Sequence, residues 1–180
     1  MVGRGSARAR LLAAASARFY AQGVTATGID VITGDAGVAK MSLYNNFRSK
    51  AELVAAYLDQ RQQEFLALYR RRTEGPGPRA LAVFDAYLEH AEGGDFRGCG
   101  LLNAAGELPT DDPGRALVAG HKAEVEDLLR EALAPREDAD ALAEHLSLLL
   151  EGAMVRGGLE GDLERVRRAR AIAAGLLGED

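Results

Sequence analysis

Apolar residues recur at helical spacing along most of the chain. In the first such segment Leu11, Ala15 and Phe19 lie four residues apart, and the pattern ends at Gly23. This spacing predicts an amphipathic helix over residues 6–22. No segment alternates apolar and polar residues over a strand's length, and no Asn-Gly pair suggests a hairpin turn. The predicted fold class is therefore all-α.

Two shorter helical patterns follow, separated by a glycine. Ile32 and Ala36 share one face of the first, which ends at Gly37, a residue that adopts a positive φ without steric cost. In the second, Leu43 and Phe47 are inward positions four residues apart, so the polar side chains between them face outward. A short helix, a glycine-containing turn and an outward-polar helix form the layout of a helix-turn-helix, whose second helix enters the major groove of DNA.

The rest of the chain is also predicted to be helical. A long helix begins at Ser49, with Glu52 placed as in a capping box, and ends at the GPGP sequence of residues 75–78. Five further helical segments are expected at residues 78–92, 98–107, 112–134, 138–158 and 161–177. We therefore predict an N-terminal three-helix domain, residues 1–48, and a C-terminal helical domain, residues 49–180.

The charge is unevenly divided along the chain. Residues 1–50 contain seven lysines and arginines and two aspartates, a net charge of +5. The remaining 130 residues carry 15 basic and 25 acidic side chains, a net charge of −10. A basic N-terminal region suits a polyanionic partner such as nucleic acid, although a charge cluster alone is also typical of a solvated surface.

The composition argues against several other classes of protein. Apolar residues make up 47% and charged residues 27% of the chain, as in ordinary globular proteins. Cys99 is the single cysteine, so no internal disulfide is expected. Even the most apolar run, residues 146–155, is interrupted by Glu151, so no membrane span is predicted. We expect a cytoplasmic protein that does not enter a membrane.

The stretch LLAAASARFYAQGVTATGIDVITGDAGVAKMSLYNNFRSKAELVAAYL, residues 11–58, resembles the N-terminal DNA-binding region of the TetR family of transcriptional repressors. Residues typical of the family stand in its order and spacing at Phe19, Gly23, Thr27, Ile32, Ala36, Gly37, Val38, Leu43, Tyr44, Phe47, Lys50 and Leu53. The resemblance covers about a quarter of the chain and is far more specific than a bare helix-turn-helix pattern.

The resemblance implies an all-helical homodimer that binds a palindromic double-stranded operator and releases it when a small-molecule effector binds the C-terminal part. Matching positions imply phosphate contacts from Thr27, Tyr44 and Lys50. They imply base contacts from Lys40, Met41, Ser42 and Asn45. One departure from the family pattern is Ala39, which replaces the serine that usually caps the second helix, a loss worth about 1 kcal/mol.

The last two predicted helices each carry an apolar stripe. The stripes consist of Leu142, Leu146, Leu149 and Ala153 on the first helix and Leu163, Val166, Ala173 and Leu176 on the second. By the family plan these side chains form a four-helix dimer interface. The alternative, equally weighted without the resemblance, is that both stripes pack within their own subunit. Gly152, Gly157 and Gly158 permit close helix approach or mark weak helix.

An unusual segment, FRGCGLLNAAGELPTDDP at residues 96–113, suggests an effector site. Pockets in helical bundles are largely apolar, with a few polar groups from facing helices. The candidate pocket residues are Tyr87, Cys99, Leu102, Asn103 and His121. Each of these residue types is also common in an ordinary protein core.

Two other functions remain as alternatives. One is a helical scaffold that binds a partner protein and not DNA, which the basic N-terminal region disfavours. The other is an enzyme with Cys99 as its nucleophile, although the sequence contains no phosphate-binding loop, HExxH helix or GxSxG turn. We therefore predict no catalytic residue, no bound metal and no cofactor.

Overall fold

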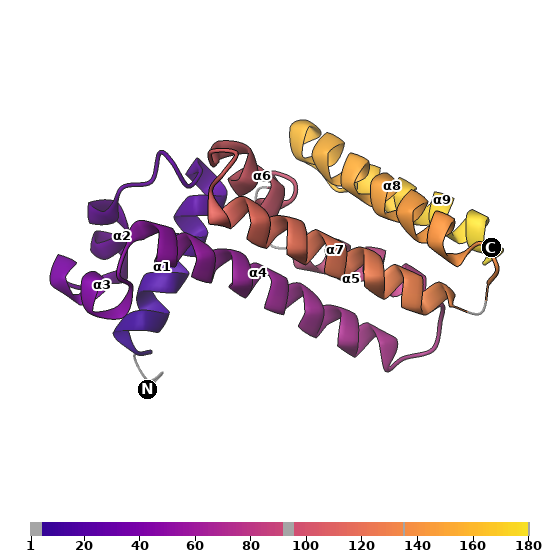
Figure 1. Cartoon of the computed structure of the whole chain (residues 1–180), viewed down its shortest axis with the longest axis horizontal. Coiled ribbons are helices and arrows are strands. Elements are labelled where there is room, and N and C mark those ends of the chain that lie inside the picture. The colour runs from indigo at the N-terminus through magenta and orange to yellow at the C-terminus, as the bar shows by residue number, and fades with distance from the viewer. Residues whose placement is uncertain (1–4, 92–95, 135, 180) are drawn as a thin grey trace. The chain divides into compact units, whose positions relative to one another are not determined.

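The structure is a computed structural model that describes residues 5–91, 96–134 and 136–179. Within these ranges it consists of nine α-helices and contains no strand, which confirms the predicted all-α class (Figure 1). The helices are α1 (Ala7–Gln22), α2 (Ile29–Ala36), α3 (Lys40–Asn46), α4 (Lys50–Thr73), α5 (Arg79–Ala91), α6 (Gly100–Glu107), α7 (Pro113–Leu133), α8 (Ala139–Glu160) and α9 (Glu164–Leu177). In the part of the chain described, no helix is long and apolar enough to cross a membrane.

The chain forms two compact units. The first unit comprises Met1–Arg61 and Gly100–Val118, and the second comprises Gln62–Cys99 and Ala119–Asp180. The helices α4 and α7 therefore contribute residues to both units. The division into domains of residues 1–48 and 49–180 stays a prediction.

The first unit is built around large apolar side chains from α1 to α4. Phe19, Ile32, Leu43 and Phe47 are all buried, as their spacing in the sequence predicts. The ring of Tyr57, in α4, packs edge-on against that of Phe19 with their centroids 5.5 Å apart. These contacts hold α2 and α3 on α1 and leave the opposite face of α3 outward.

A glycine turn sets the direction of α3. Gly37 ends α2 in the left-handed conformation, with φ of 61°, which a residue with a side chain adopts only at a cost. The backbone N–H of Val38 donates to the Thr33 carbonyl at 3.1 Å and closes the end of α2. The turn predicted from the sequence is thus present.

The start of α4 has the predicted capping residues in a slightly different arrangement. The Ser49 hydroxyl accepts a hydrogen bond from the Glu52 N–H at 3.1 Å. The Glu52 carboxylate accepts from the Arg48 N–H at 2.8 Å, one residue earlier than a standard capping box requires. Both bonds satisfy backbone donors at the junction of α3 and α4.

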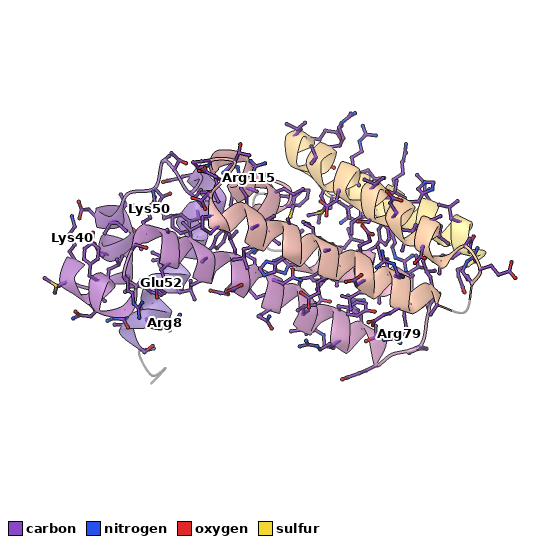
Figure 2. The ribbon with its side chains drawn as sticks, viewed as in Figure 1. Arg8, Lys40, Lys50, Glu52, Arg79 and Arg115 are labelled. Atoms are coloured by element: carbon purple, nitrogen blue, oxygen red, sulfur yellow. The ribbon has the colours of Figure 1, made fainter. Side chains whose placement is uncertain are left out.

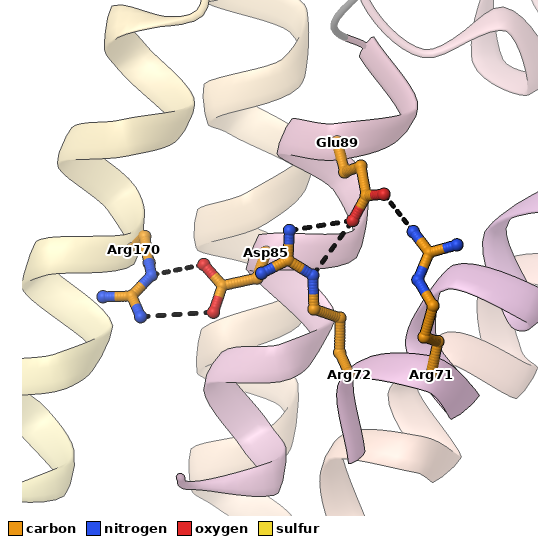
Figure 3. Close-up of polar contacts among 5 residues, drawn as sticks. All are labelled: Arg71, Arg72, Asp85, Glu89 and Arg170. Carbon is orange, nitrogen blue, oxygen red and sulfur yellow. Dashed lines mark hydrogen bonds and ion pairs between the residues drawn. The ribbon is translucent and has the colours of Figure 1, made fainter. Parts of the chain in front are cut away.

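In the second unit, ion pairs join helices distant in sequence. Arg71 and Arg72, at the end of α4, both contact the Glu89 carboxylate of α5, with 2.8 Å between Arg72 Nη2 and Glu89 Oε2 (Figure 3). Arg170 of α9 forms a two-bond pair with Asp85 of α5, with Nε 2.5 Å from Oδ1. Together these pairs link α5 to α4 and to α9.

Two of the glycines in α8 lie against the chain segment that precedes α6. A Cβ on Gly158 would lie 2.6 Å from the Gly98 nitrogen, and one on Gly157 would lie 2.9 Å from the Phe96 ring. A side chain at either position would therefore clash with the segment before α6. The close approach that these glycines permit is to this segment and not to another helix. Gly152 has no heavy atom within 4 Å of its Cβ position and carries no such contact.

Candidate nucleic-acid interface

The outer face of α3 carries the side chains that the sequence assigns to base contacts. Lys40 and Asn45 are exposed, Met41 is 69% exposed and Tyr44 is 47% exposed, whereas Ser42 is half-buried. Figure 2 shows Lys40 at the surface of the first unit. A short helix thus presents an ammonium, an amide, a phenol and a thioether to solvent, and amide and ammonium groups bond to base edges and phosphates.

Lys40 has an acidic partner in α2. Its Nζ lies 2.7 Å from Oδ1 of Asp30, in the first turn of α2. The hydrogen bond from Lys40 to Asp30 raises the pKa of Lys40 above its ordinary value, so the side chain stays charged. Both side chains are well exposed, and such a surface pair contributes little to stability. Lys40 can therefore exchange Asp30 for a base or phosphate at small cost.

The predicted phosphate contacts fall in different environments. Tyr44 is exposed on α3, and Lys50 is half-buried at the start of α4, where its Nζ donates to the Thr25 carbonyl at 3.2 Å. Thr27 is buried, and its hydroxyl donates to the Gly23 carbonyl at 2.7 Å. The Thr27 side chain thus orders the loop before α2 and does not face solvent.

The loop between α1 and α2 is also held from α6. The Thr25 N–H donates to Oε2 of Glu107 at 2.8 Å, so the two backbone groups of Thr25 are bound by Glu107 and Lys50. Glu107 lies 82 residues beyond Thr25 in the chain. Nothing in its neighbourhood of the sequence indicates this contact.

The N-terminus of α3 lacks a side-chain cap. Ala39 has the extended backbone of an N-cap residue, with φ of −68° and ψ of 148°, but no side chain accepts from the first turn. The Asn46 amide donates back to the Ser42 carbonyl at 2.7 Å within the same helix. The absence of the cap expected from Ala39 is therefore confirmed.

Of the candidate effector residues, Tyr87 and Cys99 are buried in the second unit beside an ion pair that the sequence analysis missed. Lys122 Nζ donates to the Tyr87 hydroxyl at 3.0 Å and lies 2.7 Å from Oε1 of Glu151. Burial raises the pKa of Tyr87, so its hydroxyl is neutral near pH 7. Burial opposes the charge on Lys122, but Cys99, Tyr87 and Glu151 together raise its pKa well above the ordinary value.

The other candidates are dispersed. His121 precedes Lys122 on α7, and its backbone carbonyl accepts from Gln62 at 3.5 Å. Leu102 is half-buried and Asn103 is exposed, both on α6 in the first unit. The candidates thus do not form one set within a single unit. A signal for the missed Glu151 was present, since it interrupts the most apolar run of the chain.

The stripes predicted for dimerisation are mostly buried inside the chain. The buried members are Leu142, Leu146, Ala153, Leu163, Val166 and Ala173. Leu149 is half-buried and Leu176 is exposed. The apolar side chains that α8 and α9 expose are instead Leu148, Val155, Leu159, Ile172 and Leu176, of which Leu159 is 80% exposed.

Comparison with known proteins gives a consistent result. Residues 11–57 match the family described as bacterial regulatory proteins, tetR family. The chain is 33% identical over 181 residues to the probable HTH-type transcriptional regulator ArpR of Pseudomonas putida, a match that spans 95% of this chain and 78% of that protein. It is 32% identical over 174 residues to the HTH-type transcriptional regulator TtgR of the same species, across 93% of this chain and 75% of that protein.

Solved structures agree with these sequence matches. The crystal structure of a TetR-family transcriptional regulator from Streptomyces coelicolor superposes with a TM-score of 0.88 at 32% identity, covering 96% of this chain and 95% of that one. The similarity therefore extends well beyond the helix-turn-helix region. These relatives are transcriptional regulators, so an enzyme that depends on Cys99 is no longer supported.

Proposed function

The chain belongs to the TetR family of DNA-binding transcriptional regulators, and from this premise we propose that it is a repressor that leaves a palindromic operator when an effector binds. The observation that carries the proposal is the outer face of α3. Lys40, Tyr44 and Asn45 are exposed there, on a helix fixed from beneath by buried Leu43 and Phe47. This arrangement suits entry into a major groove.

The proposed contacts divide by chemistry. Lys40, Asn45 and the neighbouring Met41 and Ser42 approach base edges, and they set the sequence preference. Tyr44 and Lys50 hold phosphates, which contribute affinity without sequence information. Thr27 contributes to this surface through the loop that it orders, because its hydroxyl is occupied by the Gly23 carbonyl.

The homodimer is proposed to form through the exposed apolar side chains of α8 and α9. A groove of about 370 Å³ between these helices is lined by Leu148, Gly152 and Ile172, among others. It offers space for side chains of a second copy. We thus still assign the interface to α8 and α9. The side chains proposed to form it are Leu148, Val155, Leu159, Ile172 and Leu176, and not the buried stripe residues.

The effector is proposed to bind in the second unit near Tyr87, Cys99 and His121, with Lys122 and Glu151 as the charged groups of the site. Lys122 joins Tyr87 and Glu151 through polar contacts, and sites for small organic molecules combine a few such polar groups with an apolar lining. An effector acts on DNA binding only if it binds the DNA-competent and DNA-incompetent states with different affinity.

Gel retardation with the DNA upstream of the protein's own coding region tests the proposal. We expect retardation at low salt, because two basic N-terminal regions neutralise phosphates. Lys50→Ala should weaken binding to all sequences alike, whereas Asn45→Ala should change the sequence preference. Arg167→Ala, at an exposed position of α9, is the matched control for loss of a positive charge. Absence of retardation by the unmodified protein at low salt would contradict the proposal.

A further inference from the structure

The first unit contains a cavity whose lining shares only Lys50 with the proposed DNA contacts. Its volume is about 540 Å³, within the range of sites for small organic ligands. Three segments form its walls: the loop between α1 and α2, the first turns of α4, and the connection from α6 into α7. The apolar lining consists of Val24, Ala51, Val54, Ala55, Leu108, Pro113, Gly114 and Leu117.

The polar lining is sparse and contains two residues of opposite charge, Asp112 and Lys50. Asp112 Oδ1 accepts from the Gly114 N–H at 2.7 Å, so the carboxylate charge lies at the positive end of α7. Lys50 is the only cation among the described lining residues. Its ammonium donates to the neutral Thr25 carbonyl and has no carboxylate partner within the described residues. The cavity thus combines an apolar wall with one cation that forms no ion pair within the described residues.

We propose that this cavity binds a small, mainly apolar molecule that carries one negative charge, with its apolar part against Val54 and Leu117 and its anionic group on Lys50. A carboxylate or sulfonate on a hydrophobic skeleton has this chemistry. The anion gains a charge-assisted hydrogen bond, and the skeleton leaves water.

Occupation of the cavity has a consequence for the adjoining helix-turn-helix. Lys50 and Glu107 hold the two backbone groups of Thr25, in the loop that leads to α2. A ligand anion competes with the Thr25 carbonyl for the Lys50 ammonium, so it weakens that contact while the Glu107 bond remains. The same ammonium is a proposed phosphate contact, so the ligand should weaken operator binding. This second step rests on the proposed function, whereas binding of the ligand does not.

Two fluorescent dyes that differ only in a sulfonate test the site. 8-Anilinonaphthalene-1-sulfonate is the anionic probe, and N-phenyl-1-naphthylamine is its uncharged counterpart. We expect the protein to prefer the anionic dye, and Lys50→Met to lower that preference by about threefold, as expected for a partly exposed ion pair. Ala55→Phe places a ring in the cavity and should weaken the Lys50-dependent binding by about tenfold or more.

Two further variants make the result specific. Ala51→Phe fills the same cavity from an exposed position, so it serves if Ala55→Phe fails to fold. Ala67→Phe, at an exposed position later in α4, is the matched control and should leave both dye affinities within about twofold. Unchanged dye binding in a folded Ala55→Phe or Ala51→Phe variant would overturn the site. An unchanged dye preference in Lys50→Met would overturn its anionic character.

Gel retardation with saturating anionic dye tests the consequence. The dye should weaken operator binding by the unmodified protein and not by Ala55→Phe. Equal weakening of both proteins would overturn the link between cavity and operator. A protein that binds the dye in this cavity but retards no DNA would contradict the proposed function and leave the ligand site established.

Discussion

At the scale of single residues, Lys122 and Glu151 form an ion pair that is mostly buried in the second unit. Their side chains are only 16% and 23% exposed, and Glu151 Oε2 has no hydrogen-bond partner among the described residues. Near neutral pH, Glu151 is the charged partner of the ammonium, because burial keeps the Tyr87 hydroxyl neutral. Each charge is tolerated in this place only because the other is present.

The pair gives the first prediction. Lys122→Met should lower the free energy of unfolding by about 3 kcal/mol at pH 7, since it leaves the Glu151 carboxylate without its partner. The double variant Lys122→Met/Glu151→Leu should recover most of that loss. Urea denaturation measures both. Arg136→Met, which removes an exposed ion pair with Asp138, is the control and should have a small effect. A double variant less stable than Lys122→Met would refute this explanation.

Residue pairs of this kind could not be predicted from the sequence. Tyr87, Lys122 and Glu151 lie on three helices, and no local pattern indicates that they meet. The same holds for Glu107 and Thr25. By contrast, the exposure of Lys40, Met41, Tyr44 and Asn45 followed from their position opposite Leu43 and Phe47 on one short helix. Periodicity predicts the face of a residue but not its distant partner.

At the scale of elements, α3 is a short helix that lacks a side-chain cap. It spans only Lys40–Asn46, and its N-cap residue Ala39 offers no acceptor for the first turn. Ala39→Ser should raise the free energy of unfolding by about 1 kcal/mol, because the backbone already has N-cap geometry. Urea denaturation tests this value. Ala39→Val adds bulk without an acceptor and should give no gain, so equal stabilisation by both variants would contradict a capping effect.

The stability that Glu160 contributes at the junction of α8 and α9 should depend on pH. Hydrogen bonds from Arg165 and Arg156 lower the pKa of Glu160 to about 2 from its usual 4.5. The carboxylate therefore stabilises the fold above about pH 4.5, and this contribution is lost as the pH falls toward 2. The stability difference between the unmodified protein and Glu160→Gln should shrink over that interval in urea titrations. Arg165→Gln should weaken the same pH dependence, and a difference constant down to about pH 3 would refute it.

The helices themselves were predictable to within a few residues, whereas the outer face of α8 was not. Leu142, Leu146 and Leu150 pack inward, but Leu148 and Leu159 also lie on this helix and are exposed. A helix that is apolar on two sides gives no periodic signal for the side that packs within its own chain. The periodic pattern alone therefore left open whether Leu142, Leu146, Leu149 and Ala153 pack within the chain or against a second copy.

At the scale of the whole molecule, the exposed stripe predicts the oligomeric state. Leu148 is 67% exposed and lines the groove between α8 and α9. Leu148→Glu should raise the dimer dissociation constant by about tenfold or more, since it places a charge in an apolar contact. Sedimentation equilibrium measures this shift, and circular dichroism checks the fold. Glu144→Gln, one turn away on α8, is the control. A protein that is monomeric at every concentration would contradict the proposed dimer.

The division of charge between the N-terminal region and the rest of the chain governs how DNA binding responds to salt. With a net charge of +5 in residues 1–50 and −10 elsewhere, the net attraction for phosphates comes from the N-terminal region. The logarithm of the operator association constant should fall linearly with the logarithm of salt concentration, by about 0.9 for each phosphate neutralised. Lys50→Ala should reduce this slope by about 0.9 per subunit, whereas Asn45→Ala should leave it unchanged and alter sequence preference. Fluorescence anisotropy at several salt concentrations separates the two effects. An unchanged slope in Lys50→Ala would show that Lys50 does not hold a phosphate. Loss of a contact to another group lowers affinity but leaves the number of released counterions, and therefore the slope, the same.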